Sequence, residues 1–598
     1  MRASSSTSSR WWLLATSVLL GSVSGEAPLV TKAWRGAGME SLPPAWPESA
    51  LPELSSRENV GLVMSGGGSR SFIVSLGYLK AFVDLGLIGR VRYLSGTSGG
   101  SWATSLFTFA STAVAPTDAI LLGNLTDPAD IVLADLKVMD PRCGRAAATA
   151  DFIGKVAGRI LSDGLDGAWV RTVSEVYLEN YGVSGASFPT WSAATAADVA
   201  ARNPALAAGG AAGASFVTPR DASRPFPLLS ISLLGPTAMV PFDLKTRRYT
   251  ILEATPLYAG VPRTHNATYH KKPILGKRTA ETRQIGGLVE PWAVMAKGGA
   301  AAPMASAAEG SVVLRENSTA GALTIGLATA ASSYAPGDVV SSWSGLTSSW
   351  GIDVPYWPLQ TAAEAAASGA AGGGLPQPVD TFTLGDGGNM ENPNLISLLQ
   401  RRVGRIIVCC NFNLPLAPRA KWDPHARAPT DKDIDNDLPA FFGIEVASAT
   451  AAGYFLELNT VFNGSDFARV ASELQDAAGS AGRGRGAVAT TPLVTVANDW
   501  WGIPAGFQVN VTWIYLSRAR EWEQQLSPEM FAAAVSPKDP NCTDPTVTPS
   551  KGDFKHFPHY STETQIEQSN QQANLLADLA GWTIKANADI LFKVFDSN

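Results

Sequence analysis

Two short apolar runs, each followed by a glycine-rich turn and a helical pattern, mark the region from residue 60 to residue 110. The runs Val60–Ser65 and Val91–Ser95 have the length and composition of buried strands. Between them, Ser69–Leu85 carries apolar residues at a spacing that buries one face of a helix, and Trp102–Phe109 continues as a second helix. A strand–helix–strand unit of this length predicts two parallel strands joined by a right-handed crossover.

Farther along the chain the pattern predicts more elements of both kinds. The expected strands are Phe226–Leu234, Arg248–Leu252, Val379–Leu384 and Arg405–Cys409, and the expected helices are Ile160–Tyr181, Ile396–Arg401 and Thr562–Phe595. Tracts rich in Ala and Gly at 193–214, 297–309 and 360–376 are predicted to be insertions, the first of them flexible. Because no repeat and no clear linker divides the chain, we expect a single domain over residues 26–598.

The N-terminus has the features of a secretory signal over residues 1–25. Arg2 and Arg10 supply positive charge, Trp11–Leu20 is a short apolar run, and Val23-Ser24-Gly25 offers small residues for cleavage. A membrane anchor is the alternative, but the run is shorter than the roughly 20 apolar residues that a span needs. We therefore expect a secretory-pathway protein that is secreted, or held in a vacuole or lumen, with or without membrane association.

Six N-x-[ST] sequons agree with that route, and together they predict a glycoprotein. Their asparagines are Asn124, Asn266, Asn317, Asn463, Asn510 and Asn541. The net charge of −6 provides no basic surface for phosphate backbones, so we expect no nucleic acid, and nothing implies a protein partner.

Cysteines and acidic residues give no sign of a metal site. The four cysteines, Cys143, Cys409, Cys410 and Cys542, could form up to two disulfides, although the adjacent Cys409 and Cys410 are not expected to pair with each other. The run Asp431, Asp433, Asp435 and Asp437 lacks the central Gly and closing Glu of an EF-hand. We interpret it as a solvated turn, and we expect no metal and no cofactor.

Ser98 is the candidate nucleophile. It lies in the pattern G-x-S-x-G, where Gly96 and Gly100 allow a tight strand-to-helix turn that exposes a hydroxyl. An ordinary Gly/Ser turn produces this pattern often, so it is weak alone. The preceding strand and the following helix N-terminus, which favours negative charge, strengthen it.

A glycine loop precedes this serine. Gly66, Gly67 and Gly68 follow the first strand and present backbone N–H groups that can hold an oxyanion. A phosphate-binding loop is the alternative, but no G-K-[ST] follows. Arg70 comes next and is predicted to hold a substrate phosphate through its forked donors; the alternative is a surface arginine.

Asp386 is the candidate base. It sits in the turn Gly385-Asp386-Gly387-Gly388 directly after a predicted strand, where a carboxylate can point into a cleft, although plain Asp-Gly turns are common. We expect a dyad in which Asp386 takes the proton of Ser98 directly. The alternative is a Ser–Asp–His triad, for which His556 or His559 has the allowed chain order. Such triads usually carry a histidine beside the oxyanion glycines, and this chain does not.

Three motifs together resemble the phospholipase B / lysophospholipase catalytic-domain family, which includes fungal phospholipases B and animal cytosolic group IV phospholipases A, and more distantly patatin. They are S-G-G-G-S-R at Ser65–Arg70, Y-L-S-G-T-S-G-G-S-W at Tyr93–Trp102 and D-G-G-x-x-x-N-P at Asp386–Pro393. Weaker likenesses are E-A-T-P-L-Y-A-G from Glu253 and G-G-L-V-E-P-W from Gly286. The resemblance spans a core of about residues 55–410.

The resemblance implies an α/β fold, with a central, mostly parallel sheet, flanking helices and variable cap insertions. The helical periodicity of Thr562–Phe595 adds an expected C-terminal helical extension. The resemblance also implies that Ser98 attacks an acyl ester, that Asp386 acts as base, that the glycines around Gly67 hold the oxyanion and that Arg70 lies near the lipid phosphate. The expected substrate is a phospholipid or lysophospholipid at a membrane or micelle surface. A catalytically weak or inactive lipid-binding relative, a transacylase and a Ser–Asp–His lipase or esterase are the alternatives. The calcium-binding lipid module of many cytosolic relatives is not expected.

Overall fold

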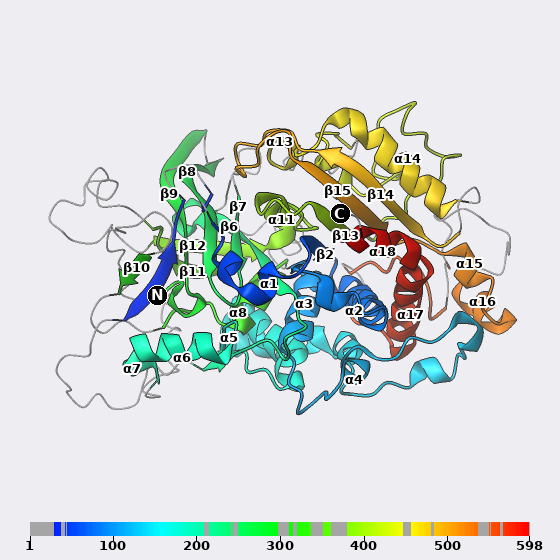
Figure 1. The fold of residues 1–598 in the computed structure, drawn as a ribbon, viewed down its shortest axis with the longest axis horizontal. Coiled ribbons are helices and arrows are strands. Elements are labelled where there is room, and N and C mark those ends of the chain that lie inside the picture. Colours follow the sequence, from blue (N-terminus) through cyan, green and yellow to red (C-terminus); the bar gives the residue numbers. More distant parts are fainter. Residues whose placement is uncertain are drawn as a thin grey trace, which may run out of the picture.

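A large mixed sheet runs through the molecule, with helices packed along it (Figure 1). The computed structural model describes residues 29–36, 42–43, 45–207, 215–240, 242, 249–274, 276–296, 310–314, 320–335, 351–359, 380–446, 456–479, 484–535, 549, 552–562 and 566–596. The predicted signal segment, Asn317, Asn541, Cys542 and the tracts 297–309 and 360–376 lie outside these residues.

The described strands include a 13-stranded sheet. Its strands are β1 (Val30–Trp34), β2 (Val60–Met64), β3 (Tyr93–Thr97), β6 (Phe226–Pro236), β7 (Thr250–Ala254), β8 (Ala259–Ile274), β9 (Lys277–Val289), β10 (Gly310–Val313), β11 (Ile352–Tyr356), β12 (Asp380–Asp386), β13 (Arg405–Cys410), β14 (Ala487–Val494) and β15 (Gln508–Tyr515). A separate pair joins β4 (Phe188–Pro189) and β5 (Phe216–Val217).

The helices are distributed along the whole chain. They are α1 (Pro52–Ser55), α2 (Gly68–Asp84), α3 (Gly99–Phe109), α4 (Asp118–Leu122), α5 (Phe152–Tyr177), α6 (Ala193–Arg202), α7 (Pro204–Ala207), α8 (Ile325–Ala331), α11 (Ile396–Gln400), α12 (Asp437–Ala440), α13 (Leu456–Asn459), α14 (Phe467–Ala478), α15 (Arg520–Glu523), α16 (Pro528–Ala534), α17 (Asn570–Ala586) and α18 (Ala588–Asp596). None of the described helices has the length and apolar character needed to cross a bilayer.

Five neighbouring strands at the centre of the sheet are parallel, in the order β6, β3, β2, β13 and β15. The sheet continues with antiparallel strands on both sides, through β7, β8, β9, β1 and β10 toward one edge and β14 toward the other. The predicted α/β class, with a central sheet and flanking helices, is confirmed. Within this sheet the parallel pairing is confined to these five strands, whereas β12, which carries Asp386, pairs antiparallel with β6.

The end of β3 meets the end of β12 along one edge of β6. β3 runs parallel to β6, and its last residue, Thr97, pairs with Ser230. β12 runs antiparallel to β6, and its last residue, Asp386, pairs with Ile231, the next position along β6. The residue that follows β3 is Ser98, so this topology brings Ser98 and Asp386 together although 288 positions separate them.

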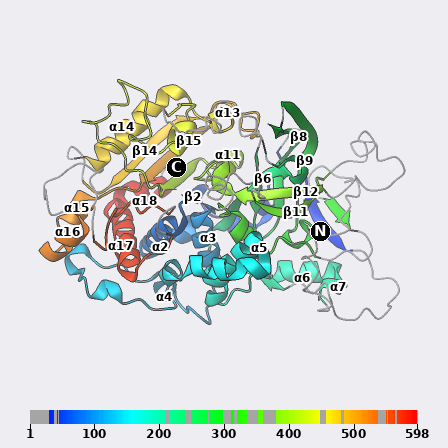
Figure 2. The same cartoon turned by 180° about the vertical axis from the view of Figure 1, so that it is seen from behind.

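The C-terminal helix α17 packs directly on α2, the helix that follows the glycine loop (Figures 1 and 2). A Cβ added at Gly77 of α2 would lie 2.5 Å from the carbonyl oxygen of Ala577, so only glycine permits this approach. The predicted C-terminal helical extension is therefore present as α17 and α18, and it covers the helix that positions the glycine loop.

The Ala-rich tract was predicted to be a flexible insertion, and this prediction is wrong for its first part, which forms α6 and α7. Alanine has the strongest helix propensity, and Ser192 caps α6 by accepting the N–H of Thr195. Asn203 then exchanges two hydrogen bonds with the backbone of Val30, at 2.6 and 2.9 Å, which ties the helices to β1.

A buried cluster of ion pairs gives a structural role to one of the weaker motifs of the sequence. Arg401 is fully buried, and its guanidinium donates to Glu48 at 2.9 Å and to both oxygens of Glu253 at 2.6 and 2.8 Å. Tyr258 donates to Glu48 at 2.9 Å. Glu253 and Tyr258 belong to the E-A-T-P-L-Y-A-G stretch, so that stretch neutralises a buried arginine. Removing one partner of such a pair would leave an uncompensated buried charge.

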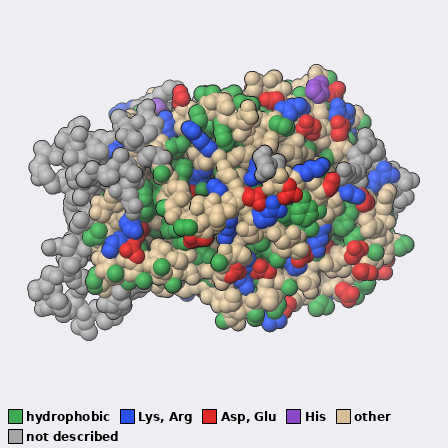
Figure 3. All heavy atoms as spheres, viewed as in Figure 1, with side chains coloured by type: hydrophobic (Ala, Val, Ile, Leu, Met, Phe, Trp, Pro, Cys, Tyr) green, Lys and Arg blue, Asp and Glu red, His purple; other side chains and the backbone are tan. Residues whose placement is uncertain are grey.

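On the face shown in Figure 3, acidic and basic side chains are interspersed and do not gather by sign. The asparagines of the four described sequons, Asn124, Asn266, Asn463 and Asn510, are all exposed. Each of these positions is therefore accessible to solvent.

Candidate active site

Ser98 occupies a strained turn between β3 and α3. Its φ of 51° and ψ of −123° are rare for a residue with a side chain and cost about 1–3 kcal/mol. The turn is held because the Ser98 carbonyl accepts the N–H groups of Ser101 at 2.9 Å and Trp102 at 3.2 Å. A Cβ at Gly100 would lie 2.1 Å from the carbonyl oxygen of Met64, so glycine is required for α3 to start this close to β2. The predicted strand-to-helix turn is present.

The hydroxyl of Ser98 donates to the carboxylate of Asp386. The Oγ–Oδ2 distance is 3.0 Å, and each residue is 8% exposed. The other carboxylate oxygen of Asp386 accepts the N–H of Gly388 at 2.8 Å, and its backbone carbonyl accepts the hydroxyl of Ser232 at 2.7 Å. A serine hydroxyl and a carboxylate are thus held within proton-transfer distance in a site largely closed to solvent.

The glycine loop lies against the Ser98 turn. A Cβ at Gly66 would lie 3.0 Å from the Cβ of Ser98, so the two loops touch. The N–H of Gly66 donates to the carbonyl of Asn392 at 3.1 Å and is therefore already used. Gly67 and Gly68, with φ of 127° and 55°, stand at the start of α2, where N–H groups have no acceptor within the helix.

Arg70 lies beneath this loop and is only 3% exposed. Its Nε donates to the carbonyl of Asn411 at 3.0 Å, and its Nη1 donates to the carbonyl of Tyr560. A Cβ at Gly67 would lie 2.3 Å from the Nη2 of Arg70. The guanidinium therefore packs against the loop and supports it. The alternative interpretation, a surface arginine, is wrong because Arg70 is buried.

The two histidines of the alternative triad belong to the segment whose Tyr560 carbonyl accepts a hydrogen bond from Arg70. His559 is buried, its Nδ1 is 3.4 Å from the carbonyl oxygen of Phe412, and burial lowers its pKa to about 3. His556 is exposed, with a φ of 69°. Among the interactions of the described residues, none joins either ring to Ser98 or Asp386.

Asn392 and a pair of aspartates form a feature beside the site that was not predicted. Besides the bond from Gly66, Asn392 makes a side-chain hydrogen bond to Asp437. The N–H of Asp437 donates to Asp435 at 3.2 Å, and burial raises the pKa of both aspartates. The solvated-turn interpretation is therefore wrong for these two, which are half-buried beside Asn392. It is also wrong for Asp433, which is buried and accepts hydrogen bonds from Arg427 and Thr430. The Asn-Pro at the end of the motif D-G-G-x-x-x-N-P is the sequence signal from which a role for Asn392 could have been predicted.

The cysteines form no disulfide in the described part of the chain. Cys143, Cys409 and Cys410 are free and buried, and burial raises the pKa of each thiol. As predicted, Cys409 and Cys410 do not pair with each other. In the same described ranges, no group of His, Cys, Asp or Glu is arranged to hold a metal ion.

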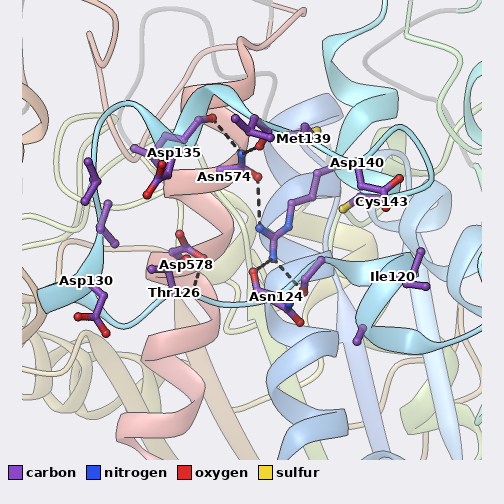
Figure 4. Close-up of a pocket in the computed structure, with 17 residues that line it drawn as sticks. Ile120, Asn124, Thr126, Asp130, Asp135, Met139, Asp140, Cys143, Asn574 and Asp578 are labelled. Carbon is purple, nitrogen blue, oxygen red and sulfur yellow. Dashed lines mark hydrogen bonds between the residues drawn. The ribbon is translucent and has the colours of Figure 1, made fainter.

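A cavity of about 360 Å³ lies away from this site, between residues 119–145 and α17 (Figure 4). Asn574 and Asp578 project into it from α17, and Asp578 accepts the N–H of Thr126 at 3.0 Å. Asp578 is 2% exposed, and burial raises its pKa to about 6, an effect that the charge of Arg145 partly offsets. Neither Ser98 nor Asp386 lines this cavity.

The buried Asp578 predicts a pH-dependent stability. Its folded-state pKa of about 6 lies above the value of about 4 expected in the unfolded chain, so its contribution is present below pH ~4 and is lost as pH rises through about 6. Asp578→Asn keeps an oxygen for Thr126 and cannot titrate. Between about pH 4.5 and 7.5, its free energy of unfolding should fall less than that of the wild type, by on the order of 2 kcal/mol.

Urea unfolding at the two pH values measures this difference. Asp135→Asn is the matched control, because Asp135 lines the same cavity but is exposed. Parallel pH dependences for wild type and Asp578→Asn would contradict the assignment.

Comparisons with known proteins find a family match for the part of the chain that contains Ser98. Residues 62–154 match the family model described as Patatin-like phospholipase. None of the curated proteins matches the chain. Among solved structures, it is similar to Human GIVD cytosolic phospholipase A2, with 13% identity, 90% of this chain and 62% of that chain covered, and a TM-score of 0.42.

A second structure of that human enzyme, in complex with Methyl gamma-Linolenyl Fluorophosphonate, gives 12% identity, 91% and 59% coverage and a TM-score of 0.39. The chain spans about three fifths of the length of these solved chains. The family match over residues 62–154, which hold the glycine loop, Ser98 and α3, supports a lipid acyl hydrolase of the patatin-like kind.

Proposed function

We propose that this protein is a serine acyl-ester hydrolase that removes fatty acids from glycerophospholipids, lysophospholipids or both, through a Ser98–Asp386 dyad. The observation that carries the proposal is the 3.0 Å hydrogen bond from Ser98 Oγ to Asp386 Oδ2, formed where β3 and β12 meet. A nucleophile needs an adjacent base to be active at neutral pH, and this carboxylate is placed to serve.

The reaction follows from this geometry in two stages. As Ser98 Oγ attacks the ester carbonyl, Asp386 takes the hydroxyl proton, and the carbonyl oxygen becomes an oxyanion beside Gly67 and Gly68. The open N–H groups at the start of α2 stabilise that charge, and the helix dipole adds to them. Collapse of the intermediate breaks the bond to the leaving alcohol, which receives the proton from Asp386. Water, deprotonated by Asp386, then attacks the acyl-serine. The bond from the acyl carbon to Ser98 Oγ breaks, the fatty acid leaves, and Asp386 returns the proton to Oγ.

The dyad is favoured over a triad because the described structure offers Ser98 a carboxylate and no imidazole. Asp386 is already the hydrogen-bond acceptor of Ser98, the place that a histidine takes in a triad. His559 contacts the carbonyl of Phe412 instead. A direct carboxylate base suits ester substrates, whose alkoxide leaving group is less demanding to protonate than an amine.

Phospholipid as the substrate rests on the family match and on Arg70, for which we keep the phosphate-binding role as a prediction. Arg70→Ala should slow hydrolysis of phosphatidylcholine at least about tenfold more than that of a neutral ester with the same acyl chain, since a contact of the guanidinium charge with the phosphate is lost only with the phospholipid. Initial rates on both substrates measure the ratio, with Arg70→Lys retaining the charge but not the fork.

Equal losses on the two substrates would assign Arg70 to support of Gly67 and remove the phosphate role. That outcome has its own structural basis in the contacts of Arg70 with the carbonyls of Asn411 and Tyr560.

Product analysis with phosphatidylcholine labelled differently on its two acyl chains tests the proposed function. We expect release of labelled fatty acid, and the pattern of labels separates removal of one chain from removal of both. Transfer of label to another lipid would identify a transacylase. Binding to the lipid with no release from phosphatidylcholine or lysophosphatidylcholine would support the inactive lipid-binding alternative and contradict the proposal.

We further propose that the protein acts along the secretory route. The apolar N-terminal run and the exposed sequon asparagines of the described chain support this. A glycosidase-induced loss of mass in protein from a secreting cell would test it, and an unmodified intracellular product would contradict it.

A further inference from the structure

Ser332, at the C-terminal end of α8, bonds to the turn of Ser98, to the turn that follows Asp386 and to β6. Its backbone carbonyl accepts the N–H of Ser98 at 3.1 Å and the N–H of Gly387 at 3.0 Å. Its hydroxyl donates to the carbonyl of Ser230 on β6 at 2.6 Å and also accepts the N–H of Ser98 at 3.1 Å. Ser332 is fully buried, so solvent cannot replace any of these bonds.

These bonds tie the nucleophile and the base to one oxygen atom. Ser98 and Gly387 belong to turns that follow different strands, β3 and β12. A carbonyl oxygen has two lone pairs, and here one goes to each turn. The distance between Ser98 Oγ and Asp386 Oδ2 is therefore fixed by a group that lies between the two turns, in addition to the pairing of their strands with β6.

The bonds also hold the strained backbone of Ser98. A φ of 51° for a serine persists only where the surroundings over-determine it. The Ser98 carbonyl is held within α3, and the Ser98 N–H is held by Ser332. Because that N–H is already used twice, it is not open to an oxyanion, and the N–H groups of Gly67 and Gly68 remain for that task.

The end of α8 is itself anchored to its neighbours. The carbonyl of Ala330 accepts the indole N–H of Trp169 from α5 at 3.1 Å. Thr329 shares a hydrogen bond with Ser105 of α3 at 2.9 Å, and Ser333 accepts the indole N–H of Trp102 at 2.9 Å. Ser332 thus lies at a helix end that hydrogen bonds connect to both α5 and α3.

We propose that Ser332 is a positioning residue that sets the geometry of the Ser98–Asp386 pair. It touches no reacting atom and acts through the backbone of Ser98 and Gly387. This inference rests on the proposed hydrolase function and adds to it a residue that no motif of the sequence marks.

The test compares Ser332→Ala with Ser105→Ala. Both variants remove one buried hydroxyl from the contact between α8 and its neighbours, but Ser105 bonds only to Thr329 and not to Ser98 or Gly387. Five quantities are measured for each variant: kcat and KM on phosphatidylcholine, the rate of covalent labelling of Ser98 by a fluorophosphonate, the pH profile of kcat, and the midpoint of thermal unfolding.

For Ser332→Ala we expect kcat and the labelling rate to fall about 10- to 100-fold with KM changed less than about twofold, because misplacement of the nucleophile affects the chemical step. The alanine keeps the backbone carbonyl but loses the hydroxyl bond that anchors it to Ser230. The acidic limb of the pH profile should therefore move by about half a unit, since a shift of that carbonyl displaces Gly387, the neighbour of Asp386. Ser105→Ala should keep kcat and the pH profile within about twofold and about 0.2 units of the wild type, with a comparable change in the unfolding midpoint.

Wild-type kcat, labelling and pH profile in Ser332→Ala would overturn the proposal, as would equal losses in Ser105→Ala. An inactive wild-type protein that also fails to label would instead overturn the hydrolase function, so the two failures are distinguishable.

Discussion

Ser98→Ala is expected to reduce fatty-acid release from phosphatidylcholine by at least about 10³-fold. Without Oγ no acyl-serine forms, and only binding and the oxyanion site remain to assist attack by water. Scintillation counting of released fatty acid gives the rate, and a fluorophosphonate should no longer label the chain.

The same variant should stay folded. The turn at Ser98 is held by backbone bonds to Ser101, Trp102 and Ser332, and alanine retains all of these backbone groups. We expect the free energy of unfolding to change by no more than about 1–2 kcal/mol, the worth of the lost bond to Asp386. Residual activity above a tenth of the wild-type rate in folded Ser98→Ala would show that another group is the nucleophile.

Asp386→Asn is expected to have a similarly large effect, roughly 10³-fold or more on kcat. The amide is the same size and keeps an oxygen for the N–H of Gly388, but it cannot take the proton of Ser98. The loss should appear in kcat more than in KM, because the carboxylate acts on the chemical step.

The histidine variants complete this comparison. We expect His556→Ala and His559→Ala to keep their activity wherever they fold, since neither ring contacts Ser98 or Asp386 in the described structure. Normal turnover in Asp386→Asn would refute the dyad. Loss of turnover in a folded histidine variant would restore the triad.

The region from β2 to α3 could be predicted closely from the sequence because its signals are local. Apolar runs, helical spacing and glycine turns all occur within about 50 residues, and the observed bounds, from Val60 to Phe109, lie near the predicted ones. Asp386 was predicted from a short turn after a strand and from a family resemblance. Its contact with Ser98 depends on two strands that share the edge of β6, which no local pattern encodes.

Residues whose role is to connect distant segments could not be predicted in this way. Ser332 lies in an alanine- and serine-rich stretch with no motif, and it gains its role only because α8 ends where β3 and β12 meet. Asp435 and Asp437 appeared to be a solvated turn because charge density predicts exposure. In the fold their turn packs beside Asn392 and Tyr515, which removes much of that solvent.

The long hairpin of β8 and β9 and the pair β14–β15 were also missed. In β8 the run Thr264–Lys272 contains many polar residues and lacks the regular apolar alternation that predicts a strand. These segments form strands because they pair with each other: β8 and β9 satisfy each other's backbone hydrogen-bonding groups over a long register. The apolar alternation that marks a half-buried strand is weak where a hairpin extends beyond the core.

Mass spectrometry of the chain, acid-quenched during turnover of phosphatidylcholine, would detect the proposed acyl-serine directly. A peptide containing Ser98 should gain the mass of one fatty acyl group. This species should accumulate in wild type and be absent from Ser98→Ala and Asp386→Asn. An acyl group on any other residue, or steady turnover with Ser98 unmodified and replaceable by alanine, would contradict the proposed mechanism.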